Sequence, residues 1–239
     1  MKFRYELTLG IDAADSAGAF IEEQFRNTDF KKLNADEVLV LVSNKAWHDA
    51  MSYVGRFVIT DRAIKSEMQE KAFDAIKDYI DAGVILEDYA TAGIPDMDLP
   101  HDLELGVWQK YASMVFKYLY CIEIMNIKKE FKWFSLSEYA KCKCPVDRLI
   151  ARSVFSMLPF DRKGERALAW FLSSNSPEEA IYKNISWSKI TEDEYHMFQN
   201  SVAFICDSFD EKLTPLEFDL AFWEPANILD KQGMERYRV

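Results

Sequence analysis

The chain has 239 residues, of which 49% are apolar and 14% aromatic, enough to bury a large core in one domain or two. Its formal net charge of −11 argues against nonspecific attachment to nucleic acid or to anionic lipid, since both are polyanions. Four cysteines are too few for a disulfide scaffold, and no stretch is long and apolar enough to span a bilayer. We therefore expect a soluble, cytoplasmic protein without a signal peptide.

The first sixty residues have the pattern of a small α/β unit. Residues 2–9 alternate apolar and polar side chains, which predicts a half-buried strand. Residues 37–43 form a continuous run of leucine and β-branched side chains, which predicts a strand buried on both faces. Residues 56–60 are a candidate third strand. A helix is expected between the first two strands, starting at Asp12 or Asp15 and ending at Phe25.

The buried face of that first helix is expected to consist of Ala17, Phe20, Ile21 and Phe25. From Asp61 onward the apolar side chains recur with a period of 3.6, and Gly83 supplies a helix stop. This second apolar stripe consists of Ile64, Met68, Ala72, Ala75, Ile76, Tyr79 and Ile80. A third long helix is expected over residues 102–126.

Start signals predict four more helices in the second half of the chain. Pro145 fits the first turn of one helix. Ser176–Glu179, Thr191–Glu194 and Thr214–Glu217 each place a hydroxyl residue three positions before a glutamate, which is the pattern of a capping box. We therefore predict an α+β fold, in which a small N-terminal strand–helix–strand unit is followed by a mainly α-helical region.

Residues 87–102 are rich in Gly, Pro and Asp and are the best candidate for a linker or long surface loop. We place two lobes on either side of it. Residues 1–90 would form an α/β lobe with one long helix, and residues 100–239 a mainly helical lobe.

Acidic residues cluster in and around this loop. No Lys or Arg lies between Lys77 and Lys110. A surface of a single charge sign steers a partner of opposite charge and speeds encounter. The side chains predicted to bind a basic protein partner are Glu87, Asp88, Asp96, Asp98, Asp102 and Glu104. The glycine and the closing glutamate of a calcium-binding EF-hand loop are absent, so we expect no metal here.

Residues 128–166 are basic, with ten Lys or Arg against five Asp or Glu. Part of this segment resembles a helix-turn-helix in outline, with two short helices joined by a tight turn. The first helix would bury Leu136, Tyr139 and Ala140, and the second would bury Val146, Leu149, Ile150 and Val154. The nucleic-acid-binding side chains of this alternative would be Lys141, Lys143, Arg148 and Arg152, with both arginines pointing outward.

No catalytic or metal signature is visible. Cys142 and Cys144 have C-x-C spacing without a second Cys/His pair, which does not fit a zinc site. The three histidines, His48, His101 and His196, belong to no local catalytic motif, and no nucleotide-binding motif occurs. No cofactor is expected.

The leading hypothesis is a non-enzymatic binding protein, of the inhibitor, immunity or assembly-subunit type, that engages a basic protein partner through acidic surface. The first alternative is nucleic-acid binding through residues 128–166. The second is an enzyme whose site is assembled only in three dimensions. Separated charge could also drive head-to-tail self-association of the chain.

Overall fold

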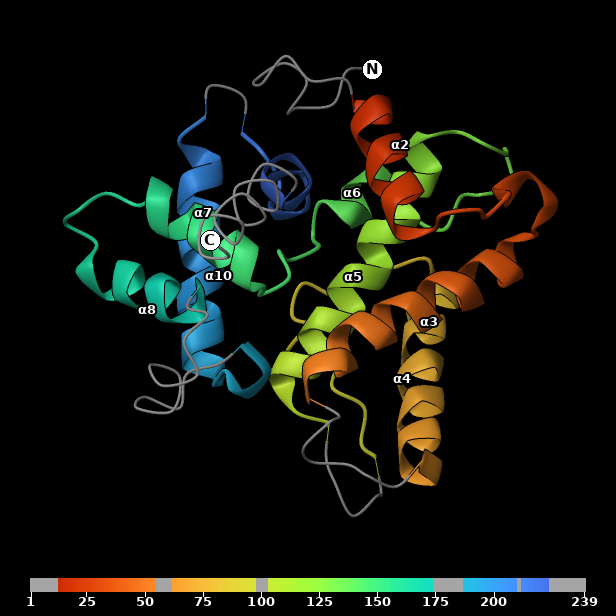
Figure 1. Ribbon diagram of the computed structural model, residues 1–239, viewed down its shortest axis with the longest axis horizontal. Coiled ribbons are helices and arrows are strands. Elements are labelled where there is room, and N and C mark those ends of the chain that lie inside the picture. The colour runs from red at the N-terminus through yellow and green to blue at the C-terminus, as the bar shows by residue number, and fades with distance from the viewer. Residues whose placement is uncertain (1–12, 55–61, 98–102, 174–186, 210–211, 224–239) are drawn as a thin grey trace, which may run out of the picture. The chain divides into compact units, whose positions relative to one another are not determined.

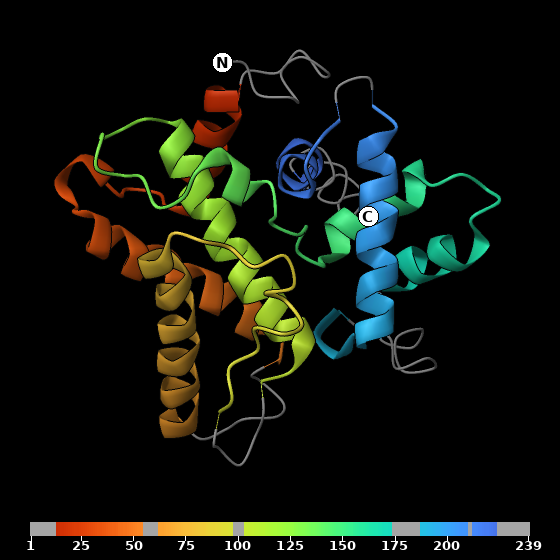
Figure 2. The ribbon, with the colours of Figure 1, turned by 180° about the vertical axis from the view of Figure 1, so that it is seen from behind.

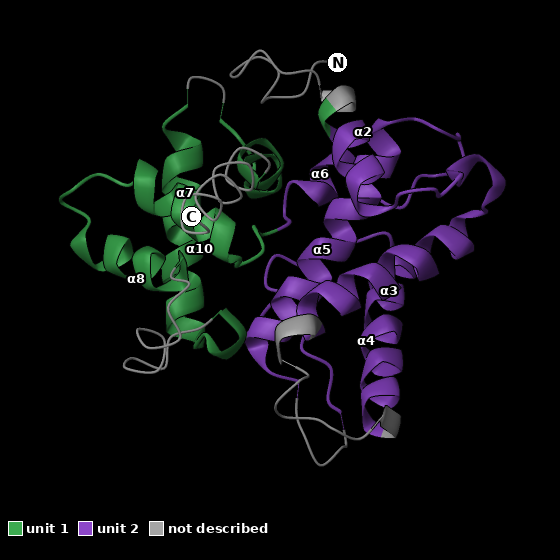
Figure 3. Ribbon diagram, in the orientation of Figure 1, with its two compact units in different colours: residues 1–16, 143–239 green, residues 17–142 purple. Residues whose placement is uncertain are grey.

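The computed structural model describes residues 13–54, 62–97, 103–173, 187–209 and 212–223. Every regular element in these residues is helical (Figure 1). The chain divides into two compact units, one of residues 17–142 and one that combines residues 1–16 with residues 143–239 (Figure 3). The predicted α+β fold is therefore wrong, because the described part of the chain contains no strand–helix–strand unit.

The unit of residues 17–142 is built around one central helix. Its helices are α2 (Ala13–Gln24, which begins just before the unit), α3 (Ala35–Val54), α4 (Arg62–Ala82), α5 (Leu105–Ile124) and the short α6 (Leu136–Tyr139). From Gly106 to Ile122, every residue of α5 except Met114 is buried. A helix buried all round forms the core against which the others pack, and α3 crosses it closely (Figure 2).

The strand predicted over residues 37–43 is instead part of α3. Asn34 and Glu37 form a reciprocal capping box: the Asn34 N–H donates to Glu37 Oε2 at 2.8 Å, and the Glu37 N–H donates to Asn34 Oδ1 at 2.9 Å. The side chains spaced four apart, Val38, Val42, Ala46 and Ala50, are all fully buried. Val40 is 47% exposed, so the run is buried on one side only, as in a helix. The strands predicted over residues 2–9 and 56–60 lie outside the described residues.

The other helices expected in this unit are confirmed. In α2, the four side chains expected on the buried face are buried: Ala17, Phe20, Ile21 and Phe25. α4 ends at Gly83, which has a φ of 65°, a conformation that glycine adopts without strain. There the Gly83 N–H donates to the Ile80 carbonyl and the Val84 N–H to the Tyr79 carbonyl, the paired bonds that commonly close a helix.

The unit that contains residues 143–239 packs three helices together, α7 (Arg148–Met157), α8 (Lys163–Ser173) and α10 (Glu192–Asp207). Residues 215–223 are also helical. The capping box predicted at Thr191 with Glu194 is confirmed. The helix start predicted at Thr214 is also found, and Thr214 forms a capping box with Glu217. The one predicted at Ser176–Glu179 lies outside the described residues.

The helix start predicted at Pro145 is wrong. Asp147 caps α7 by accepting from the Leu149 N–H at 2.8 Å, so the helix begins at Arg148. Pro145 lies in extended chain before it. A carboxylate cap satisfies a free backbone N–H, which a proline upstream cannot do.

Candidate functional site

The segment expected to form a helix-turn-helix has a different structure. α6 is a single turn of four residues, and eight non-helical residues, 140–147, separate it from α7. The boundary between the two compact units, after Cys142, falls inside this connection. A helix-turn-helix needs two helices joined by a turn of three or four residues. The expected tight turn is therefore absent.

The burial expected for this segment is confirmed only in part. In the first helix, Tyr139 is buried, whereas Leu136 is 50% exposed and Ala140 is exposed. In and before the second helix, all four expected side chains are buried, namely Val146, Leu149, Ile150 and Val154. Arg148 and Arg152 were expected to point outward, but both are only half exposed and both have interaction partners.

Several cations of the basic segment are held by the protein itself. Lys141 pairs with Glu138 at 2.8 Å, and Lys143 also has a partner. Lys128 donates to the Leu33 carbonyl at 2.5 Å and lies 3.6 Å from Glu130. Cations bound to neighbouring carboxylates and carbonyls have less free charge to offer a phosphate backbone.

The acidic loop, in contrast, lies against its unit through buried side chains. Tyr89 is fully buried, and its hydroxyl lies 2.6 Å from Ser113 Oγ on α5. Its carbonyl accepts from Trp108 Nε1 at 2.8 Å. Ile85 and Met97 are also buried, one at each end of the loop. Residues 85–97 are therefore a packed part of the unit.

Three further contacts fix the course of this loop. The Ile85 N–H donates to Glu138 Oε2 at 2.7 Å, and Lys71 Nζ donates to the Met97 carbonyl. Gly93 lies so close to Tyr89 that an added Cβ would come within 2.5 Å of the Tyr89 carbonyl oxygen. These contacts, together with the buried Tyr89, fix the path of the loop.

The predicted acidic side chains are partly described. Glu87, Asp88, Asp96 and Glu104 are exposed, as expected of a docking surface, and Asp96 has an interaction partner. Asp98 and Asp102 lie outside the described residues. The structure does not test whether any of the six binds a partner.

The sequence interpretation missed a row of carboxylates on α4 that leads into this loop. These side chains recur every three or four residues and are all exposed: Glu67, Glu70, Asp74, Asp78 and Asp81. Such spacing places them along one face of the helix. Marking the polar side chains of the predicted helix by face, as well as the apolar ones, would have found the row.

We call the row on α4, together with Glu87 and Asp88, the acidic surface. Its two parts meet at Tyr79, whose pKa is raised by burial and then by the nearby charges of Asp88 and Asp78. None of its seven carboxylates has an ion pair within the described residues. Like charges three or four apart on a helix cost a few tenths of a kcal/mol per pair, roughly, so this surface does not stabilise its own helix.

The carboxylate of Glu123 has a structural role. Glu123, near the end of α5, accepts through Oε1 from the Tyr139 hydroxyl at 2.6 Å and from the Trp133 and Phe134 N–H groups at 2.6 and 3.2 Å. Burial raises its pKa, and these hydrogen bonds oppose the rise. Burial and the Glu123 charge raise the pKa of Tyr139. These hydrogen bonds hold residues 133–139 against the C-terminal end of α5.

The four cysteines and the described histidines form no reactive site. All four cysteines are buried free thiols, and burial raises the pKa of Cys206 to about 12. Thiols of that kind remain protonated and unreactive at neutral pH. His48 and His196 are exposed, and His101 lies outside the described residues. Among the described residues, no three His, Cys, Asp or Glu side chains converge as a metal site requires.

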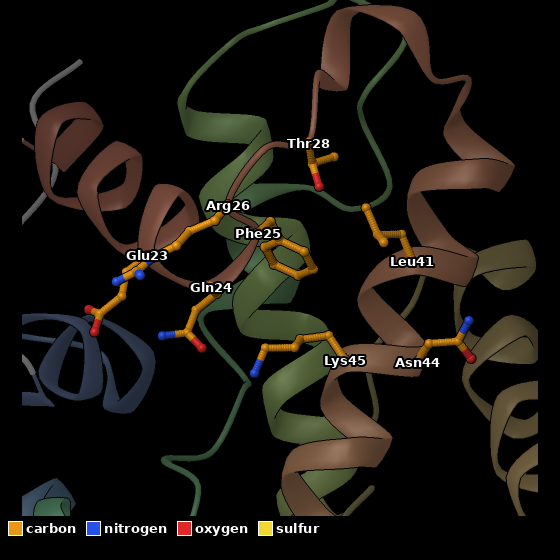
Figure 4. Close-up of a pocket in the computed structure, with 8 residues that line it drawn as sticks. All are labelled: Glu23, Gln24, Phe25, Arg26, Thr28, Leu41, Asn44 and Lys45. Atoms are coloured by element: carbon orange, nitrogen blue, oxygen red, sulfur yellow. The ribbon is translucent and has the colours of Figure 1, made fainter.

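A shallow pocket of about 490 Å³ lies between the end of α2 and α3 (Figure 4). Its lining residues are Glu23, Gln24, Phe25, Arg26, Thr28, Leu41, Asn44 and Lys45. Lys45 is bound to Asp49 at 2.6 Å, and Asp49 also accepts from the Tyr118 hydroxyl at 2.9 Å. Glu23 and Lys45, the acid–base groups of this lining, both already have partners. We assign it no reaction.

No helix in the described ranges combines the length and the apolar composition needed to cross a bilayer. No protein family, no curated protein and no solved structure matches the chain. Its function must therefore be argued from its own surfaces.

Proposed function

We propose that the protein is a non-enzymatic binding protein whose acidic surface engages a basic protein partner, in the manner of an inhibitor, an immunity factor or an assembly subunit. The observation that carries the proposal is the row of exposed, unpaired carboxylates on α4, continued by Glu87 and Asp88. Clustered charge of one sign attracts and orients a partner of the opposite sign.

The scaffold beneath this surface supports the same proposal. Tyr89, Ile85 and Met97 hold the loop against the helices through buried contacts, while Glu87 and Asp88 stay exposed. A surface already fixed in place loses little conformational entropy on binding. A disordered acidic tail would attract the same partner but would have to order its residues on contact.

The nucleic-acid alternative receives less support. Two of its four proposed contacts, Arg148 and Arg152, are half-buried and already have partners. Lys141 is paired with Glu138. The whole chain is anionic, which adds long-range repulsion from a phosphate backbone.

Affinity capture from a native lysate tests the proposal. The tagged full chain serves as bait beside a neutralised variant, Asp78→Asn/Asp81→Asn/Glu87→Gln/Asp88→Asn. We expect the wild type to retain a protein of basic isoelectric point at low salt. Raising the salt from ~50 mM to ~500 mM should release that protein, because screening over a Debye length weakens exposed charge pairs.

The matched control removes the same number of exposed carboxylates outside the acidic surface. It carries Glu22→Gln, Asp36→Asn, Glu130→Gln and Asp193→Asn, all of which are exposed. The control should retain the partner, whereas the neutralised variant should lose it. Equal loss in both variants, or capture that does not respond to salt, would overturn the proposal. Recovery of nucleic acid in its place would favour the alternative.

A further inference from the structure

An exposed aromatic surface lies on the unit that contains residues 143–239. Phe160 is 84% exposed and Trp170 is 49% exposed, and Met157, Met197 and Phe204 are exposed as well. These residues come from α7, α8, the turn between them, and α10. Single exposed apolar side chains are ordinary, but clustered aromatic ones mark an interaction surface.

The Arg166 side chain contacts two aromatic rings. The Arg166 guanidinium lies over the Phe155 ring at 4.4 Å and over the Phe160 ring at 4.5 Å, and donates to the Phe155 carbonyl at 2.9 Å. The Phe155 and Trp170 rings are 5.2 Å apart. Stacked guanidinium and aromatic groups hold each other in position, so an exposed ring here has less freedom to lose on binding.

A second pair extends the same surface. Arg162 lies 3.7 Å from the centre of the Phe204 ring and pairs with Glu165 at 3.0 Å. We call this group the arginine–aromatic surface: Phe155, Phe160, Arg162, Arg166, Trp170 and Phe204. Tryptophan and arginine are the residues most enriched at the energetic centres of protein interfaces. Lys163 is exposed beside these rings, and neither Lys163 nor Arg166 has a carboxylate partner within the described residues, so the surface suits an anionic partner.

The other unit of the same chain offers the complementary chemistry. Beside the acidic surface, Val84 and Leu86 are exposed on either side of the buried Ile85. The exposed aliphatic side chains next to Asp81 and Glu87 are complementary to the exposed aromatic rings next to arginines: apolar groups can pack together, and the charges are opposite.

We infer that the chain self-associates head to tail, with the arginine–aromatic surface of one copy docked on the acidic surface and adjoining aliphatic side chains of a second copy. This inference rests on the proposed function, since it names the cationic arginine–aromatic surface of a second copy as one partner of the acidic surface. Every molecule carries both surfaces, so a head-to-tail contact leaves one of each free and the assembly can grow.

Sedimentation velocity of the full chain tests the inference, with two variants that each disable one surface. Phe160→Asp/Lys163→Glu changes two exposed side chains at the arginine–aromatic surface. Asp81→Lys/Leu86→Lys changes two exposed side chains at the acidic one. The wild type should grow in mean size with concentration at ~25 mM salt and return toward monomer at ~300 mM, because the contact is partly ionic. Each variant alone should stay monomeric.

Mixing the two variants in equal amounts gives the decisive result. Each retains the surface that the other lacks, so the mixture should form a species of two chains that grows no further. Val40→Asp/Lys129→Glu makes the same kinds of change at exposed positions elsewhere and should associate like the wild type. A monomeric wild type at every concentration, or a mixture that stays monomeric, would overturn the inference.

The lysate capture separates this result from a failure of the proposed function. Phe160→Asp/Lys163→Glu leaves the acidic surface intact, so it should still retain a basic protein from lysate. If the wild type never self-associates but that variant does retain one, the head-to-tail inference is overturned and the proposed function is supported. If neither self-association nor capture is found, both are overturned.

Discussion

Single residues determine how the acidic loop lies on its unit, and Gly93 is the tightest of them. An added Cβ would lie 2.5 Å from the Tyr89 carbonyl oxygen and against the Tyr79 hydroxyl. The Tyr89 carbonyl is held in place, since Tyr89 is fully buried and this carbonyl also accepts from Trp108. The backbone or the tyrosine must therefore move if any larger residue replaces this glycine.

We expect Gly93→Ala to lower the free energy of unfolding by about 1–3 kcal/mol, as overpacking of a fixed site usually does. Urea denaturation followed by circular dichroism measures the change. Gly18→Ala is the control, because Gly18 lies in α2 with nothing within 4 Å of the added Cβ. That change should be neutral or stabilising, since alanine favours a helix. Equal effects of the two substitutions would contradict the packing described for the loop.

Glu123 makes stability depend on pH in a direction that follows from its burial. Burial raises its pKa in the folded state above the ordinary value of a glutamate side chain. Between the unfolded and the folded pKa, the folded chain therefore binds more protons than the unfolded chain. Stability from this group is fully present below the unfolded pKa and is lost as the pH rises through the folded pKa.

Glu123→Gln should remove this dependence while leaving an oxygen that accepts from Tyr139 and from the Trp133 and Phe134 N–H groups. We expect the variant to become more stable relative to the wild type as the pH rises through and above the ordinary carboxyl range, because the folded wild type keeps the Glu123 proton to a higher pH than its unfolded chain does. Urea denaturation of both proteins across that range measures the difference. A difference that does not change with pH would contradict the assignment.

At the scale of elements, the helices could be predicted from sequence wherever one face is apolar and the ends carry caps. α2, α4, α5 and α10 show such patterns. The buried face expected of α2 is confirmed, whereas only Met68, Ala72 and Ile76 of the stripe expected on α4 are buried. α3 was mistaken for a strand because leucine and valine dominate its first turns. Its cap at Asn34 and the four-residue spacing from Val38 to Ala50 were the signals that distinguish a helix from a strand.

The cap of α3 gives a direct test of this correction. Asn34→Ala removes the side-chain acceptor of the Glu37 N–H and should lower the free energy of unfolding by about 0.5–2 kcal/mol. A strand over residues 37–43 would gain nothing from a cap at this position. Asn200→Ala, at an exposed position inside α10, is the control and should cost little. Loss of stability from the control but not from Asn34→Ala would contradict the start of α3.

The candidate site could be predicted only in part, because some of its residues come together only when the chain is helical and packed. Glu87 and Asp88 stand out in sequence because no cation lies near them. The carboxylates of α4 are interrupted in the sequence by Lys71 and Lys77, which conceals their spacing of three and four residues. The stacking of Arg166 on Phe155 and Phe160 depends on how α7 and α8 pack, which no spacing reveals.

At the scale of the whole molecule, the two units divide the charge in a way that the linear sequence does not show. The basic segment of residues 128–166 is split between them at Cys142, and several of its cations are paired or half-buried. The acidic surface lies within one unit and is exposed. The two lobes predicted over residues 1–90 and 100–239 stay a prediction.

The most direct test of the acidic surface is the affinity of the captured basic partner, measured by calorimetry across a salt series. The wild type and Asp78→Asn/Asp81→Asn/Glu87→Gln/Asp88→Asn are compared. The account predicts that the wild type binds more tightly at low salt and that its affinity falls more steeply as salt rises, because it has four more charges to screen. Equal affinities with the same salt dependence would contradict it.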